Sequence, residues 1–239
     1  MLGKIVEAID PQPGDFIVEI GPGEGALTRP LLEKSGSLHV IELDRDLAAQ
    51  ITDPRITVHM GDALAFDFGE FPSGMRVVGN LPYNISTPLL FHLARFAERV
   101  RDLHFMLQLE VVERMVAAPS TPAYGRLSVA LQVRFRMKKL FNVSKGAFRP
   151  PPKVESAVVR MVPLAEPPQL ENTGFDDLLR RAFSSRRKQL RNALPLAPTD
   201  FAALNLDPQA RPENLSPADY VRIALHLAAN GSGARNTTG

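Results

Sequence analysis

Residues 16–25 read FIVEIGPGEG, and this stretch decides the fold class. Its first half is a run of apolar and β-branched residues, which is typical of a buried strand. Its second half brings Gly21, Gly23 and Gly25 directly after that strand. Glycines let the backbone turn sharply and approach a ligand with no side chain in between. The stretch therefore predicts a strand, a glycine loop and a helix near residues 27–34.

Short β-rich runs and helical stretches continue to alternate after this loop. Such an order is typical of a parallel sheet, so we predict an α/β, Rossmann-like domain with a mostly parallel seven-stranded sheet. The expected strands are residues 16–20, 38–43, 56–60, 75–80, 103–109, 128–135 and 156–164, with the last two forming a hairpin that closes the sheet. The expected helices are residues 27–34, 45–51, 87–97 and 110–117.

A proline-rich linker, with Pro163, Pro167 and Pro168, follows the last of these strands. Beyond it, residues 175–228 carry no strand pattern and look helical, and the ending NGSGARNTTG is flexible by composition. We therefore predict a catalytic domain over residues 1–164, a small all-helical domain over 165–230 and a flexible tail over 231–239.

Composition excludes several classes of protein. Cysteine is absent, which rules out disulfides, thiolate chemistry and cysteine-ligated zinc. The five histidines are scattered along the chain, so we expect no metal site. No stretch approaches the roughly 20 apolar residues of a membrane span, and we expect a cytoplasmic protein.

Acidic residues end the next two expected strands after the glycine loop. Glu42 lies about 20 residues past the glycines, and Asp62 lies in HMGDAL. The carboxyl ends of parallel strands meet at one edge of a sheet, where such folds bind ligands. There Glu42 can accept hydrogen bonds from ribose hydroxyls, and Asp62 with the Ala63 N–H can bind adenine. The alternatives are a glycine turn without a ligand and acids that only cap turns. Together the groups predict an adenosine-containing cofactor.

The glycine spacing does not fit the dinucleotide fingerprint G-x-G-x-x-G, which leaves less anchoring for a pyrophosphate. S-adenosylmethionine has no pyrophosphate. The E-x-G-x-G loop, with acids ending the second and third strands, resembles the class I S-adenosylmethionine-dependent methyltransferases. The cofactor-binding residues that this resemblance implies are Glu19, Gly21, Gly23, Gly25, Glu42, Leu43, Asp62, Ala63 and Asn80.

The fourth expected strand runs into Asn80-Leu81-Pro82-Tyr83. This tetrapeptide resembles the N/D-P-P-Y/F motif of enzymes that methylate exocyclic amines, with Leu81 in place of the first proline. The adenine N6 amine is a poor nucleophile, because its lone pair is conjugated with the ring. The Asn80 side-chain oxygen and the Leu81 carbonyl can accept its two hydrogens, while Pro82 stiffens the turn. Tyr83 offers a ring for the base to stack on, worth about 1–3 kcal/mol. A proline turn with a buried tyrosine is the structural alternative.

Longer segments carry a more specific resemblance. They are GNLPYNIST (79–87), LQLEVVERMVAAPSTPAYGRLSV (107–129), GAFRPPPKVESAVVRM (146–161) and FSSRRKQLRNAL (183–194). On these segments the chain resembles the bacterial small-subunit (16S) ribosomal RNA adenine dimethyltransferases, the kasugamycin-sensitivity methylase family. The resemblance implies a monomeric enzyme that converts two adjacent adenosines to N6,N6-dimethyladenosine. Its implied substrate is the 3′-terminal hairpin loop of 16S rRNA in the immature small subunit, and its implied second stacking ring is Phe148.

Charge is distributed unevenly along the chain. Residues 1–125 carry 10 Lys and Arg against 17 Asp and Glu, whereas residues 126–239 carry 18 against 9. The basic half suits a polyanion such as RNA, although a solvated helix face is the alternative. Placed on one helix, the cations of 180–191 would form a stripe suited to a phosphate backbone. The predicted RNA-binding residues are Arg149, Lys153, Arg180, Arg186, Arg187, Lys188 and Arg191.

Other functions stay open on the sequence alone. They are a large-subunit rRNA dimethyltransferase of the macrolide-resistance type, a non-catalytic ribosome assembly factor and a nicotinamide-dependent oxidoreductase. Family members usually begin with a basic segment that folds over the cofactor. This chain starts almost at the first helix, so we expect its binding of the cofactor to be weak or absent.

Overall fold

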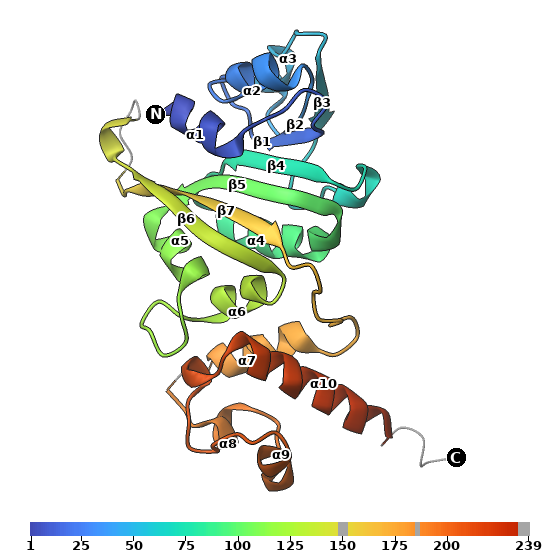
Figure 1. Ribbon diagram of the computed structural model, residues 1–239, viewed down its shortest axis with the longest axis vertical. Coiled ribbons are helices and arrows are strands. Elements are labelled where there is room, and N and C mark those ends of the chain that lie inside the picture. The colour runs from blue at the N-terminus through green and yellow to red at the C-terminus, as the bar shows by residue number, and fades with distance from the viewer. Residues whose placement is uncertain (148–152, 185–186, 234–239) are drawn as a thin grey trace. The chain divides into compact units, whose positions relative to one another are not determined.

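The computed structural model describes residues 1–147, 153–184 and 187–233, and Figure 1 shows its elements. Their contacts divide the chain into two compact units. The first holds Met1–Glu113 and Phe135–Pro163, and the second holds Arg114–Arg134 and the chain from Leu164 onward. Residues 114–134 thus belong to the second unit, although they precede the last two strands. The domain boundaries expected at 164 and 230 stay a prediction.

The first unit is built on a seven-stranded sheet with the order β3-β2-β1-β4-β5-β7-β6. β1 to β5 run parallel to one another, and β7 runs antiparallel to both β5 and β6. The predicted mostly parallel sheet is therefore confirmed. The strands are β1 Ile17–Ile20, β2 Leu38–Glu42, β3 Ile56–Met60, β4 Met75–Asn80, β5 Val100–Gln108, β6 Phe135–Val143 and β7 Ser156–Pro163.

The strand predicted over 128–135 is wrong. Those residues form most of α6 (Arg126–Gln132), and β6 is the true hairpin partner of β7. Residues 127–131 are all buried. A helix that is buried all round shows no amphipathic stripe, so its apolar run cannot be distinguished from a core strand by pattern. β6 was missed because it lies at the sheet edge, where Lys138 and Lys139 interrupt the apolar pattern.

Two helices cover one face of the sheet. α1 places Ile5 and Ile9, and α2 places Leu31, against Val40 and Val78 of the sheet. α4 lies across the sheet from them (Figure 1). Because α2 packs against the sheet, the glycine loop that connects β1 to α2 is fixed at both ends. The helices of this unit are α1 Leu2–Ile9, α2 Thr28–Ser35, α3 Arg45–Ala49 and α4 Ser86–Leu93, followed by the start of α5 Leu109–Val116.

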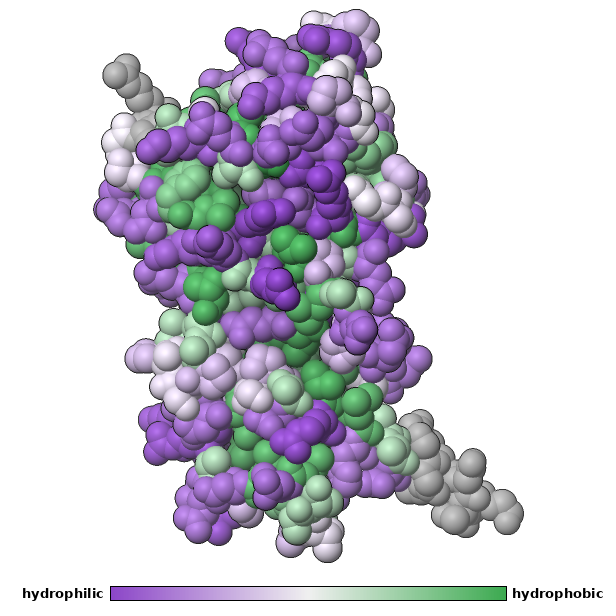
Figure 2. Space-filling view, in the orientation of Figure 1, coloured by the Kyte–Doolittle hydropathy of each residue, from purple (hydrophilic) through white to green (hydrophobic). Residues whose placement is uncertain are grey.

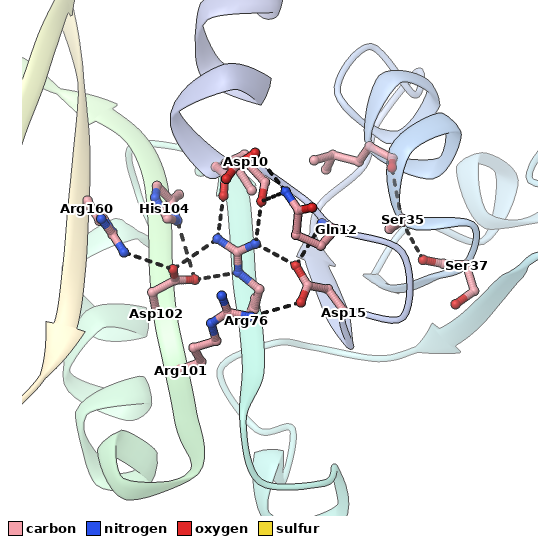
Figure 3. A network of polar contacts seen from close by, with 12 residues as sticks. Asp10, Gln12, Asp15, Ser35, Ser37, Arg76, Arg101, Asp102, His104 and Arg160 are labelled. Atoms are coloured by element: carbon pink, nitrogen blue, oxygen red, sulfur yellow. Dashed lines mark hydrogen bonds and ion pairs between the residues drawn. The ribbon is translucent and has the colours of Figure 1, made fainter.

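Figure 3 shows Arg76 at the centre of a polar network that fastens the end of α1 to the sheet. Its Nε donates to Asp102 Oδ1 at 2.9 Å, and its Nη1 donates to Asp15 Oδ2 at 2.7 Å. It also donates to the carbonyl oxygens of Ile9 and Asp10, where α1 ends. Arg76 and Asp102 are buried, so each charge depends on these partners.

The second unit is helical, as predicted. Tyr124 donates its hydroxyl to the Leu215 carbonyl at 2.9 Å, and Tyr220 donates to the Pro212 carbonyl at 2.8 Å. The ring of Phe183 packs against both tyrosine rings. These contacts explain why residues 114–134 belong to this unit. Its remaining helices are α7 Phe175–Ser184, α8 Leu190–Ala193, α9 Pro198–Ala203 and α10 Pro217–Gly233.

α10 continues to Gly233, so the first three residues of the stretch 231–239, for which a flexible tail is predicted, are helical. The rest of that prediction, residues 234–239, lies outside the part of the chain that the structure describes. Within that part, no helix has both the length and the apolar character needed to span a bilayer. The face drawn in Figure 2 is largely hydrophilic, with smaller hydrophobic areas.

Candidate active site

The carboxyl ends of β1, β2, β3 and β4 lie at one edge of the sheet, because these neighbouring strands run parallel. Backbone hydrogen bonds connect the loops there. Gly21 N donates to Ile41 O at 3.0 Å, and Gly61 N donates to Glu42 O at 3.0 Å. The edge therefore brings together the predicted residues that follow β1, β2 and β3 with Asn80 at the end of β4.

The glycine loop needs its glycines for backbone geometry. Gly21, Gly23 and Gly25 have φ of 66°, 56° and 79°, in the left-handed region that other residues rarely adopt. A Cβ on Gly21 or Gly23 would meet no atom within 4 Å, so the loop faces open space. Gly23 and Gly25 also line a cavity of about 380 Å³ together with residues of α2 and α3. An exposed backbone of this kind fits a ligand at close range.

The acids after β2 and β3 make local hydrogen bonds as well. Glu42 is buried, and its Oε1 accepts from Asp44 N at 2.9 Å. Asp62 is exposed, and its Oδ1 accepts from Leu64 N at 2.9 Å. Each of these bonds uses one oxygen and holds the carboxylate in place. Leu43 is 67% exposed between them in sequence, and Ala63 is buried.

Glu19 is the most unusual group at this edge. It is only 2% exposed, and its Oε2 has no hydrogen-bond partner among the described residues. Burial raises its pKa to about 7, and the charge of Glu42 adds to that, whereas the nearby Thr28 hydroxyl lowers it. Thr28 Oγ1 is near enough to Glu19 to lower that pKa, but it makes no hydrogen bond of normal geometry with the described residues. Buried polar atoms without partners are rare in native proteins, so this pair fits a ligand that brings polar hydrogens or positive charge.

The loop after β4 is held by a side chain that the sequence did not indicate. The Pro82 carbonyl accepts from Ile85 N at 3.3 Å, from Ser86 N at 3.2 Å and from Ser86 Oγ at 2.8 Å. Ser86 is 1% exposed, at the first residue of α4. The Leu81 carbonyl accepts no hydrogen bond from the described part of the chain, so it stays available. The only sequence signal for Ser86 is its place four residues after the proline.

Exposed groups surround this loop. Asn80 is exposed at the end of β4, and the Tyr83 ring is 44% exposed, so the tyrosine is not the buried ring of the structural alternative. Gly79, just before Asn80, is buried against β1. A Cβ there would lie 2.8 Å from the Ile20 carbonyl oxygen. Only glycine lets β4 run this close to the end of β1. The sequence signal that could have identified this close approach is a glycine inside an expected strand.

The predicted RNA-binding residues do not form one helical stripe, so that expectation is wrong. α7 ends at Ser184 and α8 begins at Leu190. Arg180 lies on α7 and pairs with Asp177 at 2.6 Å, whereas Arg191 lies on α8. The remaining described residues of the set, which are also exposed, are Lys153 before β7 and Arg187 and Lys188 between α7 and α8. Phe148, Arg149 and Arg186 lie outside the described residues.

Comparison with known proteins identifies the family. The family model for ribosomal RNA adenine dimethylase matches residues 1–229. The ribosomal RNA small subunit methyltransferase A of Thiobacillus denitrificans is 57% identical, covering 94% of this chain and 91% of its own length. The protein of that name from Aromatoleum aromaticum is 58% identical, covering 96% of this chain and 89% of its own length.

Solved structures agree in fold. A dimethyladenosine transferase from Plasmodium falciparum aligns with a TM-score of 0.82 and 26% identity, covering 96% of both chains. The 23S rRNA methyltransferase ErmE aligns with a TM-score of 0.70 and 24% identity, covering 95% of this chain and 96% of its own. The second likeness shows the fold alone.

Proposed function

This chain belongs to the ribosomal RNA adenine dimethylase family, and we propose here which of its residues carry out the reaction. It is an S-adenosylmethionine-dependent enzyme that dimethylates adenine in 16S rRNA. The family model and the names of the relatives support the dimethyltransferase over the oxidoreductase and the non-catalytic assembly factor considered above. The identity with small-subunit enzymes favours them over the macrolide-resistance type.

The single observation that supports the residue roles is the shared sheet edge. We propose that the backbone of Gly21 and Gly23 contacts the amino-acid end of S-adenosylmethionine. Glu19 and Gly25 belong to the same part of the cofactor site. Glu42 and Leu43 bind its ribose, and Asp62 and Ala63 bind its adenine. When bound, the cofactor supplies an electrophilic methyl group. Asn80 then lies next to it, because β4 pairs with β1.

The loop after β4 holds the target amine. The Asn80 side-chain oxygen and the Leu81 carbonyl accept the two N6 hydrogens and turn the nitrogen lone pair toward the methyl group. Pro82 and Ser86 keep the Leu81 carbonyl in position through the hydrogen bond between them. Tyr83 stacks on the base, opposite Phe148. Methylation makes the nitrogen acidic, so its proton passes to water without a general base, and positioning supplies most of the rate.

RNA-contacting cations are proposed in each unit separately. Exposed cations suit phosphate contacts, which position RNA without reading its sequence. The proposed contacts are Arg149, Lys153, Arg180, Arg186, Arg187, Lys188 and Arg191. We further propose that the targets are two adjacent adenosines in the 3′-terminal hairpin loop. A monomer in the cytoplasm would modify them within the immature small subunit.

Labelled methyl transfer to undermethylated small subunits tests this assignment. Asn80→Ala should lower the rate about 100-fold or more, the usual effect of removing a group that stabilises a transition state. Asn142→Ala changes an exposed amide on β6 and should leave the rate unchanged. Primer extension on both rRNAs locates the product. Full activity of Asn80→Ala, or modification of the large-subunit RNA, would contradict the proposal.

A further inference from the structure

The Glu19 carboxyl group is buried where few polar partners can reach it. Glu19 pairs in register with Val40 on β2 and Val78 on β4. These valines belong to the core that α1 and α2 cover, so Glu19 points into the same layer. α2 contributes the Thr28 hydroxyl, and β2 contributes the Glu42 carboxylate, which is also negative. A buried carboxylate is costly unless it is paired with a positive charge.

We propose that Glu19 supplies the counter-charge for a cationic group of S-adenosylmethionine, and that cofactor binding drives the proton of its carboxyl group into solvent. The inference rests on the cofactor site of the proposed function. The balance is simple: the O–H bond of the Glu19 acid breaks, the proton passes to buffer, and the carboxylate pairs with the ligand cation. That cation is either the ammonium group, which the product S-adenosylhomocysteine shares, or the sulfonium, which only the donor carries.

The direction of the pH dependence follows. With a pKa raised to about 7 by burial, Glu19 is about half protonated in the free protein at neutral pH. A bound cation favours the ionised form, so binding must first release this proton. Cofactor affinity should therefore fall about tenfold for each pH unit below that pKa and level off above it. A tenfold loss of affinity per pH unit indicates that binding is linked to the release of one proton.

Calorimetry measures the released proton directly. Binding heats are compared at about pH 7 in two buffers with different heats of ionisation, and affinities are followed from about pH 5.5 to 8.5. We expect about half a proton released per cofactor bound. Glu19→Gln should abolish both the release and the pH slope. Glu33→Gln, an exposed change on α2, should keep both.

A second measurement covers the case in which Glu19→Gln fails to fold. The ¹³C side-chain carboxyl signal of Glu19 in the free, unsubstituted protein should titrate near 7 rather than at the ordinary 4.5. Thr28→Val removes a hydroxyl that lowers the pKa, so the midpoint should rise. Addition of S-adenosylmethionine should lower it. If S-adenosylhomocysteine lowers it equally, the partner is the ammonium group; if not, it is the sulfonium.

Two results would overturn the inference, and they differ from a failure of the cofactor site. If the Glu19→Gln variant still releases a proton on cofactor binding, that proton comes from another group. If the Glu19 carboxyl signal of the free protein titrates near 4.5, Glu19 is already ionised at neutral pH and has no proton for the cofactor to displace. Binding without proton release contradicts this inference alone, whereas absence of binding at every pH contradicts the cofactor site as well.

Discussion

At the scale of single residues, the hydroxyl of Ser86 decides where the Pro82 carbonyl points. The hydrogen bond between them is 2.8 Å long and partly buried, and Ser86 itself is buried. A serine that bonds back to the carbonyl four residues earlier is common in helices, so the bond alone does not prove a catalytic role. Here, however, that carbonyl lies directly after Leu81, whose own carbonyl we assign to the target amine. We therefore propose that Ser86 is a positioning residue.

Ser86→Ala should lower kcat about tenfold while leaving the affinity for S-adenosylmethionine unchanged. The reason is that a displaced Leu81 carbonyl would misorient the target amine without affecting cofactor binding. Single-turnover methylation and calorimetry measure the two quantities. Ser86→Thr restores the hydroxyl and should recover most of the rate. A stability loss with kcat unchanged would show a purely structural role.

Gly79 acts at the same scale but on stability. Gly79→Ala places a Cβ 2.8 Å from the Ile20 carbonyl oxygen, so β4 must move away from β1. Such overpacking should cost about 1–3 kcal/mol in the free energy of unfolding, measured by urea denaturation. Gly3→Ala is the matched control, since its Cβ would meet nothing within 4 Å and alanine favours the helix. Equal stability of the two variants would contradict the close approach.

At the scale of elements, β2 and β3 are joined by a histidine pair. His39 Nδ1 lies 3.0 Å from His59 Nε2, and both rings pack among Phe16, Phe66 and Phe71. One ring donates and the other accepts, so protonating both would bring two N–H groups together. Burial lowers the pKa of each histidine, and His59 lowers that of His39 further.

This pair should make the protein less stable in mild acid. In the unfolded chain both histidines take up protons near their ordinary pKa of 6.5, whereas in the folded state they resist until lower pH. At these two histidines the unfolded state therefore binds more protons in that window, so the contribution of the pair to stability falls as pH drops below about 6.5. Glu19, whose pKa is raised to about 7, contributes in the opposite direction. Urea denaturation at several pH values measures the slope. His39→Phe should flatten it, and an unchanged slope would assign it to other groups.

At the scale of the whole molecule, the two units differ in architecture and in charge. The first carries 16 Lys and Arg against 18 Asp and Glu, and the second carries 12 against 8. The catalytic edge belongs to the first unit, and the basic residues of 180–191 belong to the second. Phosphate contacts release counterions, so each one adds to the salt dependence of RNA binding. The cations of 180–191 should accordingly contribute much of the salt dependence of RNA binding, whereas the edge of the first unit should control the chemistry.

Replacing Arg180, Arg187 and Arg191 together by glutamine should weaken binding to small subunits and reduce the logarithmic salt slope by about 2. Affinity for S-adenosylmethionine should not change. The control removes three exposed arginines of the first unit, Arg45, Arg55 and Arg95, so that net charge is matched. Filter binding over a salt series gives the slopes. Equal slopes in the two triple variants would show that only net charge matters.

Much of this architecture was readable from short patterns. The glycine loop after 16–20 and the rule that parallel strands end together were enough to predict one edge holding Glu42, Asp62 and Asn80. The tetrapeptide at 80–83 predicted the chemistry, because an amide, a carbonyl and an aromatic ring are what an adenine amine needs. The prediction of the shared edge is confirmed, because it depends on residues close together in sequence and on one general rule of sheet topology. The roles of residues 80–83 stay a prediction.

By itself, then, the sequence determined the fold class, the family and the location of the edge, since backbone periodicity and motif spacing are local properties of the chain. Only the tertiary structure decided that 128–135 is largely a buried helix, that α7 ends before Arg187, and that Glu19 lacks a partner. The physical reason is that burial, unpaired atoms and helix ends depend on groups brought together from distant parts of the chain.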